Sequence, residues 1–145
     1  QHFCFKVLYE HVVRFKKPID AKVVIGDDDV QLECLAYVVQ HNNYELLRYL
    51  ITEVNLSKSV LQRQTASEGK TITHIAAELG HDLMLYFFGE MGLDIDAVDA
   101  KGNSPLHVAV ENKRASSLKF LLSMNAELNV KNNQGRTPLH TAVLT

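Results

Sequence analysis

A period of 33 residues organises the second half of this 145-residue chain. Glycine, histidine and alanine each recur three times at that spacing: Gly69, Gly102 and Gly135; His74, His107 and His140; Ala76, Ala109 and Ala142. Such a period is typical of solenoids, in which a unit cannot bury its apolar face alone and stacks on its neighbours. The sequence therefore predicts an array of short units in place of one globular core.

Each period begins with a turn that leads into a helix. Two residues after the turn glycine comes a hydroxyl side chain such as Ser104, which is suited to N-cap a helix. Pro105 then occupies the first helical position, where its missing N–H costs nothing. His107 falls within the first helical turn, where its two ring nitrogens can bond the cap and neighbouring backbone.

A second helix completes each unit. Leu118, Leu121 and Leu122 recur at helical spacing. Gly92 and Asn125, which tolerate a left-handed conformation, then close the second helices of two successive units. Each unit is thus expected to contain two helices and an extended turn.

These motifs resemble those of the ankyrin-repeat family. The turn Gly, Thr-Pro-Leu-His, Ala-Ala, Gly-His and Leu-Leu elements are matched over residues 66–145, most fully in the unit that starts near Asp99. Ile72 and Thr73 replace the proline and leucine of the motif in the unit before it. Ser117 stands where the family usually has a large aliphatic residue, so we expect weaker packing there. The resemblance implies an all-α ankyrin-repeat solenoid of helix–turn–helix units with hairpin-like fingers.

On this resemblance, residues 1–145 form one ankyrin-repeat domain. Residues 35–51 are interpreted as a helix pair, and the connector over 55–68 carries five extra residues. Apolar residues between Phe5 and Val13 favour an amphipathic helix, and a long loop is expected over 21–30. The expected segments are a degenerate first unit with a long loop (1–32), a unit with an inserted finger (33–65), two full units (66–98 and 99–131) and a truncated unit (132–145).

The ends of the chain indicate a piece of a longer protein. The chain begins at Gln1, not at methionine, and stops within an apolar segment. We therefore expect further ankyrin repeats in the parent chain. Because the last unit has only its first helix, Leu139 and Val143 are expected to form an apolar edge without a cap.

Composition narrows the class of partner. The formal net charge is −2 and the pI is about 6.4, which gives no electrostatic reason to expect nucleic acid. No apolar run approaches the ~20 residues of a membrane span. Two cysteines, Cys4 and Cys34, make no disulfide framework, so we expect free thiols and an intracellular location, cytoplasmic or nuclear.

No motif of catalysis or of metal binding is present in the sequence. His74, His107 and His140 lie in successive units, too far apart to share one ion, and are interpreted as structural caps. The acidic run of Asp27, Asp28 and Asp29 lacks the alternating ligands of a calcium loop, so a solvated loop is expected. A nucleophile elbow and a phosphate-binding glycine loop are both missing. We expect no enzyme activity, no metal and no cofactor.

A protein-interaction module is the function that the repeats favour. By the resemblance, a protein partner contacts the concave surface of finger tips and first helices. The alternative for any one of these residues is a solvated surface position. The expected contact residues are Ser67, Glu68, Lys70, Glu78, Leu79, Ala100, Lys101, Asn103, Glu111, Asn112, Asn133, Gln134 and Arg136.

Two alternatives remain open at the level of sequence. The chain could act in cis, as a regulatory or inhibitory segment of a larger channel, enzyme or transcription factor, in the manner of ankyrin domains of the NF-κB-inhibitor type. It could also be a spacer in a long solenoid, without a partner of its own.

Overall fold

The computed structural model describes residues 28–52, 56 and 58–145. These residues form eight α-helices and no strand, and the chain divides into two compact units between Arg63 and Gln64. The amphipathic helix expected near Phe5 to Val13, and the interpretations of His2, His11 and Cys4, lie outside the described residues.

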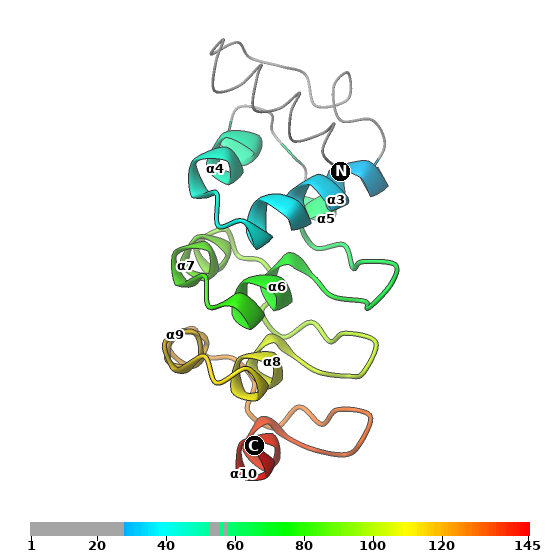
Figure 1. Ribbon diagram of the computed structural model, residues 1–145, viewed down its shortest axis with the longest axis vertical. Coiled ribbons are helices and arrows are strands. Elements are labelled where there is room, and N and C mark those ends of the chain that lie inside the picture. The colour runs from blue at the N-terminus through cyan, green and yellow to red at the C-terminus, as the bar shows by residue number, and fades with distance from the viewer. Residues whose placement is uncertain (1–27, 53–55, 57) are drawn as a thin grey trace. The chain divides into compact units, whose positions relative to one another are not determined.

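The first unit contains a helix pair and a short third helix. α3 (Asp28–Gln40) and α4 (Tyr44–Thr52) are the pair expected over 35–51, and α3 packs against α4 and α5 (Lys58–Leu61) (Figure 1). The loop expected over 21–30 is wrong at its end, because α3 already begins at Asp28. Within the connector over 55–68, Lys58–Leu61 form α5, in which Val60 and Leu61 are buried.

Cys34 departs from the expectation of free thiols. It is buried on α3 and is disulfide-bonded. The free thiol predicted there is therefore wrong: proximity in the fold, which the number of cysteines does not reveal, decides whether a disulfide forms.

The second unit stacks three successive repeats. Its helices are α6 (Ile72–Leu79), α7 (Asp82–Glu90), α8 (Pro105–Glu111), α9 (Ala115–Ser123) and α10 (Pro138–Leu144). Figure 1 shows α6, α8 and α10 in one column, called the inner helices here, with α7 and α9 in a second column. Loops project from the opposite side of the inner helices. As predicted, Gly92 and Asn125 adopt left-handed conformations after α7 and α9, with φ of 69° and 60°.

Small buried residues and a hydrogen bond between α7 and α9 are among the contacts that join the stacked repeats. Ala76 and Ala109 are fully buried on the inner helices, where a larger side chain would hold neighbouring helices apart. Ser117 is also fully buried, and its Oγ donates to Asp82 Oδ1 at 2.6 Å. The weaker packing expected at Ser117 is therefore wrong, because a satisfied hydrogen bond between α9 and α7 takes the place of an aliphatic contact.

The last inner helix has one uncovered face, as predicted. Leu139 and Val143 of α10 are 74% and 80% exposed, whereas Leu106, at the position on α8 that corresponds to Leu139, is 1% exposed. The difference arises because α10 packs on α8.

Candidate protein-binding surface

Three loops, called fingers here, precede the inner helices over residues 64–70, 97–103 and 130–136. In the second finger, Asp99 N–H donates to the Asn103 carbonyl at 2.9 Å, and Gly102 N–H donates back to the Asp99 carbonyl at 2.9 Å. The third finger repeats both bonds between Asn132, Gly135 and Arg136. Each finger is thus a closed turn with a fixed backbone.

Adjacent fingers are also bonded to one another. Ala100 N–H donates to the Glu68 carbonyl at 3.0 Å, and Asn133 N–H donates to the Lys101 carbonyl at 2.9 Å. The Asn133 side-chain amide adds a bond to the Ala100 carbonyl at 3.0 Å. The three fingers therefore form a continuous row that is ordered without a partner.

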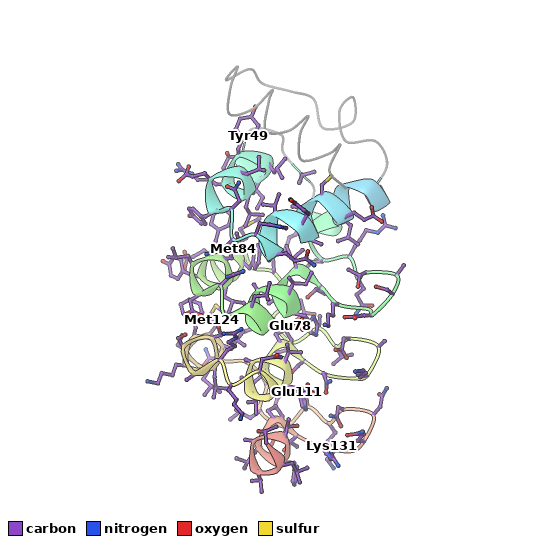
Figure 2. All side chains as sticks on the ribbon, in the orientation of Figure 1. Tyr49, Glu78, Met84, Glu111, Met124 and Lys131 are labelled. Carbon is purple, nitrogen blue, oxygen red and sulfur yellow. The ribbon has the colours of Figure 1, made fainter. Side chains whose placement is uncertain are left out.

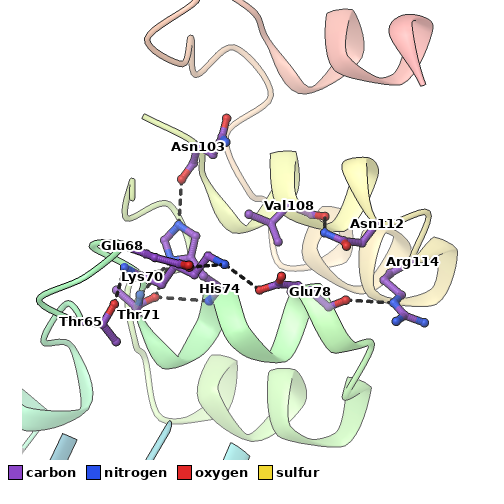
Figure 3. Close-up of polar contacts among 10 residues, drawn as sticks. All are labelled: Thr65, Glu68, Lys70, Thr71, His74, Glu78, Asn103, Val108, Asn112 and Arg114. Carbon is purple, nitrogen blue, oxygen red and sulfur yellow. Dashed lines mark hydrogen bonds and ion pairs between the residues drawn. The ribbon is translucent and has the colours of Figure 1, made fainter. Parts of the chain in front are cut away.

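The repeated histidines cap their helices, as predicted, and two of them also link neighbouring repeats. The Nδ1 atom of His107 accepts from Ser104 N–H at 3.2 Å, which leaves the proton on Nε2 to donate to the Arg136 carbonyl at 2.9 Å. His74 bonds the Asn103 carbonyl in the same way at 2.8 Å (Figure 3). Each of these rings ties an inner helix to the next finger along the stack.

The buried ring of His74 should make stability depend on pH. Burial lowers its pKa, and the hydrogen bond to the Asn103 carbonyl offsets only part of that effect. Protonation would also place an Nδ1–H against the Thr71 N–H that Nδ1 now accepts. The unfolded chain binds the proton more readily than the folded chain does. Neutral His74 therefore contributes its full stabilisation to the fold above about pH 6.5, and this contribution is lost as the pH falls through the folded-state pKa.

We therefore expect the urea midpoint to decrease between about pH 7.5 and pH 5, and to decrease less in a His74→Gln variant. Unfolding curves recorded at several pH values measure both slopes. Equal slopes in the two proteins would assign the pH dependence to other groups.

Three charged side chains meet where the first finger joins α6. Lys70 Nζ lies 2.6 Å from Glu68 Oε2 and 2.9 Å from Glu78 Oε2 of α6 (Figure 3). Burial opposes the charge of Lys70, but the hydrogen bonds to both carboxylates outweigh it and raise the lysine pKa. The hydrogen bond to Lys70 likewise lowers the pKa of Glu68. Lys70 is therefore held charged at the junction of finger and helix.

The expected contact residues fall into three groups by their exposure: partly covered, buried and exposed. Glu78 and Glu111 lie at corresponding places on α6 and α8 (Figure 2). Lys70 and Glu78 are partly covered, and Asn103 is buried, where its Oδ1 accepts from Asn132 Nδ2 at 2.9 Å. The remaining ones are exposed: Ser67, Glu68, Leu79, Ala100, Lys101, Glu111, Asn112, Asn133, Gln134 and Arg136.

Arg114 joins this surface, although the sequence patterns do not predict it. Its exposed side chain donates from Nε to the Glu78 carbonyl at 3.0 Å, so the bond joins two adjacent repeats (Figure 3). The partners are 36 residues apart and the bond goes to backbone, so no side-chain pattern in the sequence signals it.

The described residues contain no group of three His, Cys, Asp or Glu side chains placed to hold a metal ion. Within the same ranges no helix has the length and apolar character needed to cross a membrane.

Comparison with known proteins identifies the repeat. A family model described as ankyrin repeats in three copies matches residues 35–132 and 91–145. The chain belongs to the ankyrin-repeat family. Ankyrin repeats are general protein–protein interaction modules. No curated protein sequence matches this ankyrin-repeat chain.

A solved structure shares the ankyrin fold. The crystal structure of the yeast ribosomal protein Rps3 in complex with its chaperone Yar1 contains a chain that is 19% identical, with a TM-score of 0.74. The match covers 81% of this chain and 86% of the other.

Proposed function

We propose that this chain binds a protein partner through its finger–helix surface, formed by the three fingers and the exposed faces of α6 and α8. The observation that carries the proposal is the contrast between backbone and side chains in the fingers. Every finger is closed by backbone hydrogen bonds of its own, yet corresponding tip positions carry Glu68, Lys101 and Gln134. A surface ordered before binding loses little conformational entropy on association, so varied side chains on it are well placed for recognition.

The comparisons support the same proposal. Ankyrin repeats bind proteins as a family, and the similar yeast chain is part of a complex between two proteins. A non-enzymatic role is part of the proposal, with neither cofactor nor metal required.

Charge reversals on the finger–helix surface test this function. We expect a Lys101→Glu, Glu111→Lys double variant to lose at least about tenfold in affinity for a protein captured by the wild-type chain. Reversing a charge on the surface places it opposite a like charge of the partner, which opposes association. Lys119→Glu on α9 is the control, because it changes one charge away from the surface. The measurement is calorimetric titration of the identified partner, with unfolding curves to show that both variants remain folded.

The opposite result would relocate the interface. If the double variant binds normally while Tyr86→Ser on the outer face of α7 abolishes binding, the finger–helix surface is not the contact.

The cellular setting and the parent chain belong to the same proposal. We expect an intracellular protein, cytoplasmic or nuclear, that has no nucleic-acid partner. The disulfide at Cys34 counts against that location, because disulfides persist in oxidising compartments. A further ankyrin repeat would cover Leu139 and Val143 as α10 covers Leu106. Alkylation after cells are quenched in acid and denatured tests the setting. Cys34, which is buried in the fold, is then labelled if the compartment kept it a thiol and is not labelled if it is in a disulfide.

A further inference from the structure

One position in each finger is fixed by hydrogen bonds to its main chain. Lys70, Asn103 and Arg136 correspond at the repeat period, and their position is called the slot here. Each slot carbonyl accepts a backbone N–H at 2.9 Å, from Thr65, Asp99 and Asn132 respectively. In the third finger the Arg136 carbonyl also accepts from His107, and its N–H donates to Asn132 Oδ1 at 3.0 Å. The main chain therefore fixes where the slot side chain begins.

The first finger shows what a cation in this slot binds. Lys70 contacts two carboxylates, from Glu68 two residues before it and from Glu78 eight residues after it. The slot thus brings a cation to the edge between finger and inner helix, where carboxylates can reach it from both sides (Figure 3).

The third finger keeps the cation and lacks both carboxylates. Gln134 and Leu144 occupy the positions that correspond to Glu68 and Glu78. The Arg136 side chain is exposed and has no hydrogen bond or ion pair within the described part of the chain. A guanidinium presents a planar fork of donors that matches a carboxylate.

We propose that Arg136 receives a carboxylate from an acidic segment of the protein partner, which replaces the two carboxylates that neutralise Lys70 within the chain. This inference rests on the proposed function of the finger–helix surface. A carboxylate is favoured over a polyanionic nucleic acid because Glu111, exposed on α8 and likewise without an ion pair in the described ranges, would repel a run of phosphates. The partner segment is therefore acidic at the Arg136 contact without being uniformly acidic.

Selection from random peptides tests the inference and does not require the partner itself. The full chain is used to select from a phage-displayed library of random 12-residue peptides, in parallel with Arg136→Glu, Arg136→Gln and Lys119→Glu chains. Peptides selected by the wild-type chain should share an Asp or Glu at one position. Their affinity should fall about tenfold in Arg136→Gln and further in Arg136→Glu, as expected for loss of a charge-assisted contact.

The matched control and the reversed selection sharpen the result. Lys119→Glu makes the same change in net charge as Arg136→Glu but lies on α9, so its affinities should stay within about twofold of wild type. Peptides selected by Arg136→Glu should instead carry Lys or Arg at the shared position.

Two results would overturn the inference. If Glu111→Lys weakens the selected peptides but they have no acidic preference and ignore both Arg136 variants, the surface binds and Arg136 is not its carboxylate contact. If the peptides compete with none of the finger–helix variants and are lost on Tyr86→Ser, the proposed function fails as well. Enrichment of phosphopeptides or oligonucleotides over Asp/Glu peptides in a matched competition would equally reject a carboxylate.

Discussion

Replacing His107 by alanine should lower the free energy of unfolding by roughly 2–4 kcal/mol, whereas the same change at His140 should cost less than about 1 kcal/mol. Both histidines cap their helix through a hydroxyl side chain, Ser104 or Thr137. Of these two histidines, His107 alone is buried and has a ring that also bonds the next finger. Its loss leaves the fully buried Ser104 without the Nδ1 acceptor for its N–H, and opens a cavity in the stack.

Urea unfolding of the two alanine variants measures this difference. His140 is the matched control, because its capping geometry is the same and its ring is exposed. Equal losses in the two variants would show that capping within the repeat, and not the bond between repeats, provides the stability.

Gly102→Ala should destabilise the chain by roughly 2–4 kcal/mol, and Gly135→Ala by only about 1–2 kcal/mol. Both glycines have positive φ, 76° and 72°, so an alanine is strained at either position. A Cβ at Gly102 would additionally lie 2.8 Å from the backbone nitrogen of Asn133, while a Cβ at Gly135 would meet nothing within 4 Å. The difference between the two variants therefore isolates the stacking of one finger on the next.

Amide hydrogen exchange provides a second measurement of that stacking. In Gly102→Ala, the Asn133 N–H should exchange faster, because its bond to the Lys101 carbonyl must stretch to make room for the new methyl. Unchanged protection of this amide, together with equal stability losses, would mean that the fingers do not support each other.

The sequence is sufficient wherever a structural cause lies within a few residues. Ser104, Pro105 and His107 fall within one helical turn, so their capping role can be predicted from spacing alone. The left-handed helix ends at Gly92 and Asn125 are equally local, since each depends on the conformational range of one residue.

Prediction fails where the cause lies in another repeat. The sequence of its own repeat predicts a packing defect at Ser117, because Asp82, which accepts the hydrogen bond from its hydroxyl, is 35 residues away. The repeat position of Asn103 predicts a contact residue, but its side chain is buried against Asn132 of the next finger. A motif that repeats gives the position of a residue within its unit, and neighbouring units then decide whether that residue is covered.

The fixed backbone of the slot separates the requirements of folding from those of recognition. Because carbonyl and amide groups hold Lys70, Asn103 and Arg136 in place, the turn tolerates a cation or a neutral amide there without a change of main-chain bonding. A single nucleotide change at such a codon can thus alter the charge offered to a partner while the array keeps folding. The chemistry offered to a partner can therefore be changed at the slot while the histidines that join the repeats stay in place.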